Sequence, residues 1–225
     1  MRSHNTGIGK TFEEMMRIHE NNNQLADYKD VLELKSHREL SSSMITLFTK
    51  SPTHPKGANE YLRENYGKMD AKADGMKILH TTLSATRFNT FNNRFGFRLS
   101  VDPTAKKIFI IVTDLKSRKI LEDNIYYSFD ELSGIIEKKC KYIAYIIAKH
   151  KEQDGKELFH FEKSYILTGL TFEKFIKLIQ DGIILYDFRI GVYRSGKNKG
   201  KTHDHGSGFR FLKRHLQTIF NVEET

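Results

Sequence analysis

The chain has 225 residues, which is enough for one large domain or two lobes with a buried core. Its hydrophobic fraction of 38% excludes a disordered chain, and the composition excludes collagen, coiled coils and low-complexity proteins. A net charge of +9 favours polyanionic partners such as nucleic acid or anionic lipid, and the 28 acidic residues leave room for a metal site within a basic surround.

The single cysteine, Cys140, excludes an internal disulfide and a cysteine-rich zinc site, so a reducing compartment is expected. The N-terminus lacks the apolar stretch of a signal peptide. The longest apolar run, residues 142–148, is far shorter than the roughly 20 residues that a membrane helix needs. We therefore expect a soluble, cytoplasmic protein.

The first half of the chain begins with apolar residues at helical spacing, which predict a helix over residues 10–20. Residues 31–35 alternate and predict a strand with leucines on one face and a charged face that carries Glu33 and Lys35. The next expected elements are a strand over 44–49, a loop over 51–57, a helix over 58–66 and a mobile connection over 68–77.

Residues 78–127 are rich in strand patterns, and within them the continuous apolar run 108–113 suits a strand buried on both faces. A capping pattern begins a helix over 128–139. The remaining expected elements are a buried strand over 142–148, a helix with an apolar stripe over 172–179 that Gly182 ends, and a strand over 183–193. Helices interleaved with buried strands predict a mixed α/β fold.

Asp27, Glu33 and Lys35 form the first candidate site, with Glu13 on the helix before them. Phosphodiester hydrolysis needs a hard cation, and two carboxylates at a strand bend supply oxygen ligands for Mg²⁺. A lysine on the same strand face can hold the attacking water and stabilise charge in the transition state. Asp30 competes with Asp27 as the first ligand.

The pattern is weak by itself, because a charged strand face is usually just solvated, and an acidic residue in a first helical turn, as at Glu13, is ordinary. Further acid-x-lysine triplets begin at Asp70, Asp114, Glu137 and Asp154. The triplet with Glu33 and Lys35 differs in its context, because it lies on an alternating strand after a glycine-started helix in a basic chain. This context favours a nuclease.

Polar residues on and after the predicted strand over 183–193 form a second candidate site. Arginine can pair with guanine and aspartate can accept from cytosine, so Asp187 and Arg189 suit the reading of a G·C pair. A surface ion pair between them is the alternative. Histidines 203 and 205 are compatible with a metal site or a polar turn. Three lysines of the glycine-rich segment that follows are expected to contact phosphates: Lys197, Lys199 and Lys201.

Five ordered stretches of the chain resemble the MvaI/BcnI restriction endonucleases, more closely on the MvaI side, which share a MutH-like version of the PD-(D/E)xK nuclease fold. They span nearly the whole chain, so they are far more specific than one acidic triplet. The stretches are residues 5–13, 32–37, 47–52, 187–191 and 200–210.

The resemblance implies one MutH-like domain, a mixed sheet flanked by helices, with the catalytic motif in roughly residues 1–100 and most base-recognition elements in 101–225. It implies that Asp27, Glu33 and Lys35 are catalytic, that Asp27 and Glu33 hold Mg²⁺, and that Glu13 is the supporting helix glutamate. The residues that it assigns to base reading are Asp187, Arg189, His203, Asp204 and Arg210.

Such enzymes cut double-stranded DNA at short sites of the CC-x-GG type, leave 5′-phosphates and act as monomers with one active site. A cognate DNA methyltransferase is expected in the same system, though not as a physical partner. BcnI-like members have histidines where this chain has Thr49 and Gly208, so an A·T central pair is favoured.

Two features depart from the family. The spacing from aspartate to glutamate is one residue longer, which leaves Asp27 and Asp30 as alternatives, and the chain begins at the first family block, which suggests a truncated start. Other functions considered are a MutH-like mismatch-repair nicking endonuclease, a DNA-binding relative without catalysis and, as the weakest, a structural RNA-binding protein.

Overall fold

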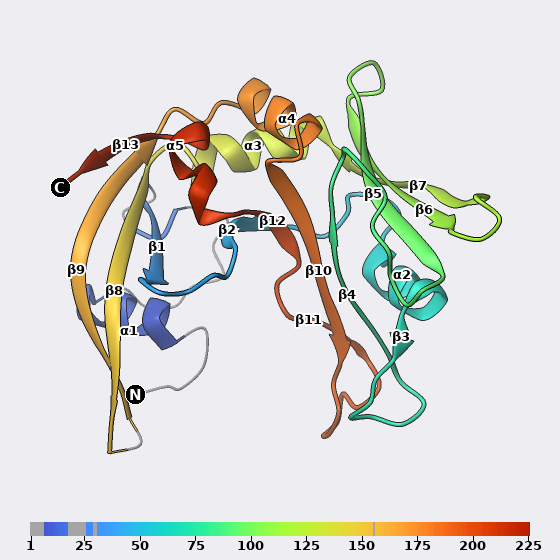
Figure 1. Cartoon of the computed structure of the whole chain (residues 1–225), viewed down its shortest axis with the longest axis horizontal. Coiled ribbons are helices and arrows are strands. Elements are labelled where there is room, and N and C mark those ends of the chain that lie inside the picture. The colour runs from blue at the N-terminus through green and yellow to red at the C-terminus, as the bar shows by residue number, and fades with distance from the viewer. Residues whose placement is uncertain (1–6, 18–25, 29–30, 155) are drawn as a thin grey trace. The chain divides into compact units, whose positions relative to one another are not determined.

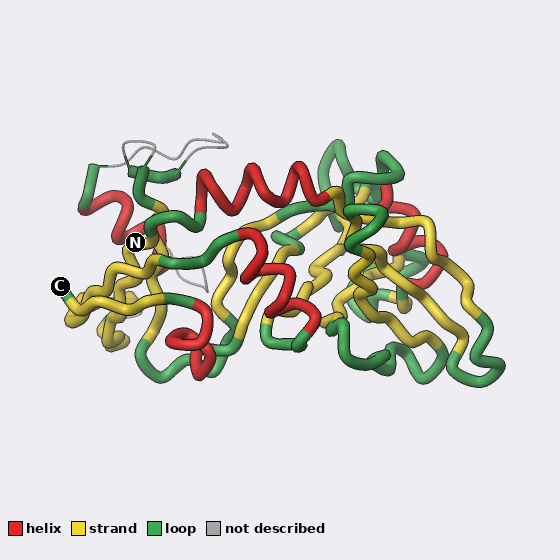
Figure 2. The backbone as a smooth tube through the Cα atoms, turned by 90° about the horizontal axis from the view of Figure 1, so that it is seen from above, coloured by secondary structure: helices red, strands yellow, loops and turns green. Residues whose placement is uncertain are grey.

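The structure is a computed structural model that describes residues 7–17, 26–28, 31–154 and 156–225. It confirms a mixed α/β fold in which strands dominate, and the longest described helix has 11 residues (Figure 2). The chain divides into two compact units, each built from more than one stretch of the sequence. Unit 1 is Met1–Ile45, Ser133–Lys174 and Leu212–Thr225, and unit 2 is Thr46–Leu132 and Phe175–Phe211.

Unit 1 is built on a four-stranded sheet with the order β1-β8-β9-β13 (Figure 1). Strand β1 runs parallel to β8, and β8 and β9 form a long antiparallel hairpin. The elements of this unit are α1 (Gly7–Met15), β1 (Glu33–Arg38), β8 (Ile143–Gln153), β9 (Lys156–Thr168), the short helices η1 (Lys213–His215) and α5 (Leu216–Ile219), and β13 (Asn221–Glu224).

The predicted strand around residue 33 is confirmed, but its two faces differ from the expected ones. Glu33 is buried, whereas Leu34 is only half-buried. Helix α1 packs against β1, and a Cβ added at Gly9 would lie 3.6 Å from Ser36 Oγ. The charged face of β1 is therefore not a solvated face, which requires a partner for the Glu33 carboxylate.

Unit 2 contains a six-stranded sheet around β10 and a separate three-stranded sheet, β5-β6-β7. In the larger sheet the order is β2-β12-β10-β4-β3, and β11 also pairs with β10. Its elements are β2 (Ile45–Thr49), α2 (Ala58–Tyr66), β3 (Lys68–Met69), β4 (Lys77–Leu83), β5 (Phe95–Asp102), β6 (Lys107–Asp114), β7 (Ile120–Ser128), β10 (Ile184–Val192), β11 (Thr202–Asp204) and β12 (Gly208–Phe211).

Aromatic side chains pack on one face of the larger sheet and form a core. Tyr186 of β10 packs against Phe209 and Tyr127, each with ring centroids 5.1 Å away. Alternate residues on β10 point to the other face, where Asp187 and Arg189 lie. The core thus fixes the strands that carry the second candidate site.

The prediction that residues 108–113 are buried on both faces is wrong. Ile108, Ile110 and Val112 are buried, but Phe109 and Ile111 are half-buried. The cause is that β6 is the middle strand of an antiparallel sheet, which commonly has one solvated face.

Two helices connect segments of the different units, and both have the expected ends. Helix α3 (Phe129–Lys139) begins where Ser128 Oγ accepts a hydrogen bond from Glu131 N at 3.3 Å. Helix α4 (Phe172–Gln180) ends before Gly182, whose φ of +72° is in the left-handed region.

Helix α1 ends at Met15 rather than at the predicted residue 20. Arg17 has a φ of +56°, and its N–H donates to Glu14 O at 3.0 Å, which closes the helix within the described residues. Residues 18–20 of the predicted helix lie outside them. No helix of the described part of the chain is long and apolar enough to cross a membrane.

Candidate active site and nucleic-acid interface

Unit 1 brings three of the predicted catalytic residues together at the start of β1. Leu34 N donates to Asp27 Oδ2 at 2.9 Å, which places Asp27 beside the strand that carries Glu33 and Lys35. Lys35 Nζ lies 3.0 Å from Glu33 Oε1. The side chains of Glu33 and Lys35 are only 9% and 14% exposed, so the pair acts in a partly desolvated environment.

The second oxygen of Glu33 is suited to a cation. Glu33 Oε2 is buried without a hydrogen-bond partner among the described residues. A buried carboxylate oxygen without a donor is costly unless a positive charge compensates it. Lys139 Nζ, at 3.9 Å, is a charge that the sequence analysis did not single out.

Asp27 and Glu33 fit a hard metal ion such as Mg²⁺, because that ion commonly takes one or two carboxylates and completes its shell with water and phosphate oxygens. Among the described residues, no group of three or more histidine, cysteine, aspartate or glutamate side chains could hold a metal by itself. The alternative ligand Asp30 lies outside the described residues.

Glu13, the predicted supporting glutamate, is half-buried on α1. The helix is held against the sheet of unit 1 by Phe12, whose ring centroid lies 5.0 Å from that of Phe161 on β9. Glu13 is therefore on an element that packs against the strand with Glu33 and Lys35.

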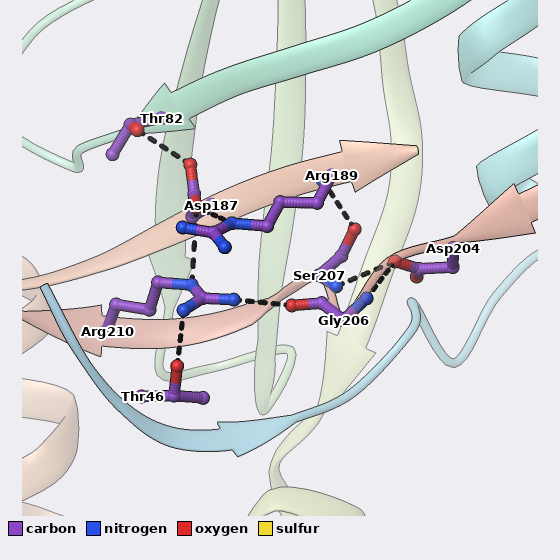
Figure 3. A network of polar contacts seen from close by, with 8 residues as sticks. All are labelled: Thr46, Thr82, Asp187, Arg189, Asp204, Gly206, Ser207 and Arg210. Atoms are coloured by element: carbon purple, nitrogen blue, oxygen red, sulfur yellow. Dashed lines mark hydrogen bonds and ion pairs between the residues drawn. The ribbon is translucent and has the colours of Figure 1, made fainter. Parts of the chain in front are cut away.

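Unit 2 holds a network of polar contacts centred on Asp187 (Figure 3). Thr82 Oγ1 donates to Asp187 Oδ1 at 2.8 Å, and Arg189 Nε donates to Oδ2 at 2.8 Å. Arg210 Nε lies 3.2 Å from the same Oδ2. The ion pair between Asp187 and Arg189, which the sequence left as an alternative to base reading, is therefore present in this structure.

The two arginines of this network differ in exposure. The Arg210 side chain is 7% exposed and also contacts Thr46 Oγ1 and Gly206 O. Burial lowers the pKa of the Arg210 guanidinium, but arginine stays charged in proteins. Arg189 is 42% exposed, so it is the arginine with more of its fork open to a ligand.

The Asp204 carboxylate organises the turn between β11 and β12. Gly206 N and Ser207 N donate to Asp204 Oδ1 at 3.0 and 2.7 Å, and Asn59 Nδ2 donates to Oδ2 at 2.8 Å. Ser207 Oγ in turn accepts from Arg189 N at 2.8 Å. Both Asp204 oxygens have partners within unit 2, so the structure gives this residue a role in shaping the loop.

His203 lies in a row of rings beside β10. Its ring stacks on Tyr193 with centroids 4.2 Å apart and lies 4.1 Å from His205. His80 on β4 continues the row, 6.4 Å from His205. Burial lowers the pKa values of His80 and His205, which favours their neutral forms. His80 was not predicted, because nothing in the sequence pairs β4 with β10.

The basic loop after β10 exposes the three predicted phosphate-contacting lysines, Lys197, Lys199 and Lys201. Its base is fixed by Arg194, whose Nε donates to Asp70 Oδ2 at 2.9 Å. Asp70 is buried, and the Lys72 amide and Arg194 hold the pKa of its carboxyl below the ordinary value.

Thr49 and Gly208, the two positions that the sequence resemblance links to the central base pair, lie next to each other. A Cβ added at Gly208 would lie 2.3 Å from Phe48 O and 2.8 Å from Thr49 Cα. These are backbone atoms of β2, so only glycine fits at position 208 without movement of the strand.

Gly208→Ala is therefore expected to reduce the free energy of unfolding by about 1–3 kcal/mol, the usual cost of overpacking. Urea denaturation measures the change. The matched control is Gly134→Ala on α3, where an added Cβ meets nothing within 4 Å and alanine favours the helix. Equal stability of the two variants would contradict the close approach of β12 to β2.

A buried carboxylate and lysine pair in one unit, and an arginine-rich polar sheet face with a basic loop in the other, are features of an enzyme that acts on nucleic acid. The comparisons with known proteins agree. The family model for the MvaI/BcnI restriction endonuclease family matches residues 1–220, and the chain belongs to this family of site-specific nucleases that act on DNA.

Two similar solved structures are of restriction endonuclease MvaI, and both are 40% identical to this chain. The complex with cognate DNA has a TM-score of 0.90 and covers 99% of this chain and 89% of that chain. MvaI in the absence of DNA has a TM-score of 0.67, with 97% and 88% covered. The search of the curated proteins finds no match.

Proposed function

We propose that this protein is a Mg²⁺-dependent type II restriction endonuclease that cuts double-stranded DNA at a short CC-x-GG-type site and leaves 5′-phosphates. The observation that carries the proposal is Glu33, a buried carboxylate in a chain of this family. One of its oxygens is hydrogen-bonded to Lys35, and the other has no hydrogen-bond partner among the residues that the structure describes. We assign the fold to the MutH-like branch of the PD-(D/E)xK nucleases.

In this proposal Asp27 and Glu33 hold Mg²⁺, which when bound supplies an acidified water and charge neutralisation at the scissile phosphate. Lys35 lies beside Glu33 and can donate to the attacking water and to the charge that develops on the phosphate. Glu13 supports the site from α1. Desolvation around Glu33 strengthens these interactions.

Recognition is assigned to the polar face of unit 2. Arg189, Arg210 and Asp187 offer the donors and acceptor that a G·C edge requires, and His203 extends the same face. Lys199 and Lys201 contact phosphates, which fixes register without reading sequence. Asp204 acts through the loop that it holds.

The central base pair is assigned to Thr49 and Gly208, because these positions are neighbours and together replace the histidines of BcnI-like members. The small Thr49 side chain and the glycine at position 208 favour an A·T centre in this proposal. We further propose that the enzyme acts as a monomer with one active site, so a double-strand break takes two nicks, and that a cognate methyltransferase protects the host site.

The test is incubation of the purified protein with plasmid DNA and Mg²⁺, followed by sequencing of the product ends. We expect discrete cuts at one CC-x-GG-type site and no cutting when EDTA removes the metal. Single-strand cuts at hemimethylated sites would indicate a mismatch-repair nicking enzyme instead. Salt-sensitive binding without cleavage at any Mg²⁺ concentration would indicate an inactive DNA-binding relative.

A further inference from the structure

Lys139, the last residue of α3, lies at the buried acidic site of unit 1. Its Nζ is 3.9 Å from Glu33 Oε2, while Lys35 Nζ is 3.0 Å from Oε1. The Glu33 carboxylate therefore lies between two ammonium groups. The proposed catalytic roles use Lys35 but not Lys139.

The backbone delivers Lys139 to this position. Glu33 N donates to Tyr142 O at 3.0 Å, and Glu33 pairs with Ile143 at the start of β8. The turn between α3 and β8 also contains Cys140, which is buried, so the end of the helix is anchored beside β1. The backbone position of Lys139 is thus fixed by the pairing of β1 with β8, which begins four residues later.

The two lysines hold Glu33 differently. Lys35 makes a hydrogen bond and its side chain is 14% exposed, whereas the Lys139 ammonium is too far for one and its side chain is 24% exposed. The ion pair of a long, flexible lysine side chain at this distance contributes little free energy, so the side chain can adopt another rotamer at little cost. Of the two lysines, Lys139 is therefore the one that can move away from Glu33.

Lys35 and Lys139 together carry two positive charges, which offset the two negative charges of Asp27 and Glu33. A divalent cation that approaches Glu33 is therefore repelled by two ammonium groups as well as attracted by the carboxylates. Its binding adds positive charge beside the two lysines, which the phosphates of DNA can balance.

We propose that Lys139 is a displaceable counter-ion of Glu33. It compensates Glu33 Oε2 in the metal-free protein and weakens divalent-cation binding there, and once displaced it pairs with a DNA phosphate. Metal and DNA then bind cooperatively, and each raises the affinity of the other. The inference rests on the proposed function, in which Glu33 is a metal ligand.

The experiment measures Mn²⁺ affinity from the EPR signal of free Mn²⁺, with and without a 20-base-pair duplex of alternating A·T pairs, which lacks any CC-x-GG sequence. For Lys139→Met without DNA, we expect Mn²⁺ to bind on the order of tenfold more tightly than to the wild type. The gain in Mn²⁺ affinity that DNA causes in the wild type should shrink. Lys139→Arg should restore wild-type behaviour.

Lys138→Met is the matched control, since it removes the same charge one residue earlier on an exposed side chain. A folding defect would weaken Mn²⁺ binding, so tighter binding separates the proposed role from a structural one. If Lys139→Met binds Mn²⁺ no more tightly than Lys138→Met does, the inference about Lys139 is overturned, but the proposed function is not. If the Glu33→Gln variant binds Mn²⁺ as tightly as the wild type does, both the metal site and the role of Lys139 are overturned.

Discussion

Lys35→Ala is expected to slow DNA cleavage by about 10²–10³-fold, the usual loss when one donor to the developing charge is removed. DNA affinity should change little, because phosphate contacts across the whole interface dominate it. Lys35 Nζ lies 3.0 Å from Glu33 in a partly desolvated site, where its charge acts strongly. Single-turnover cleavage of a duplex with the cognate site, at saturating protein, gives the rate of the chemical step.

A surface lysine of the same unit gives the matched control. Lys149 on β8 is 55% exposed and pairs with Glu162 at 2.7 Å, so Lys149→Ala removes one charge without touching the acidic site. It should cleave at nearly the wild-type rate. Equal rates for Lys35→Ala and the wild type would exclude Lys35 from the chemistry and would leave the acidic site without its proposed donor.

The sequence predicts which residues form this acidic site, but it does not predict how deeply they are buried. Alternation placed Glu33 and Lys35 on one strand face, and the structure has them there, 3.0 Å apart. Their burial could not be read from the alternation, because it depends on packing that involves distant segments. Lys139 is a basic residue in a last helical turn, so local rules explain it fully and nothing marks it as a neighbour of Glu33.

The fold was predicted best where local chemistry decides the ends of an element. The helix predicted over residues 58–66 matches α2, and the capping pattern at Ser128 correctly marks the start of α3. Strand β9 was missed, because its first half combines charged, polar and aromatic residues without a long apolar run, and its pairing with β8 supplies the stability. Strands β11 and β12 are short and depend on β10 in the same way.

Asp204 illustrates the limit for the second site. Its place in a histidine-rich segment resembles that of a base-reading residue, but side-chain type does not reveal which backbone amides lie nearby. The structure shows donors from Gly206, Ser207 and Asn59 on both carboxylate oxygens. The sequence thus locates the proposed recognition face, while the role of each residue within it depends on tertiary contacts.

Asp187→Ala is expected to reduce the free energy of unfolding by about 3–5 kcal/mol, the usual cost when one partner of a buried charge pair is removed. The Arg210 guanidinium, 7% exposed, would lose the only carboxylate that the described residues pair with it. Thr82 would also lose the acceptor of its 2.8 Å hydrogen bond. Urea denaturation of the wild type and the variant measures the loss, and selective binding to the cognate duplex should fall as well.

The double variant Asp187→Ala, Arg210→Met separates stability from recognition. Replacing both members of a buried pair by apolar residues is often neutral, so we expect the double variant to regain most of the lost stability. Preference for the cognate site should not return, because both proposed base-reading groups are gone. A double variant as unstable as Asp187→Ala would show that the stability comes from the other contacts of the two residues, which are those with Thr82, Arg189, Thr46 and Gly206. Full recovery of site preference would remove Asp187 and Arg210 from base reading and leave the exposed Arg189 as the candidate for that role.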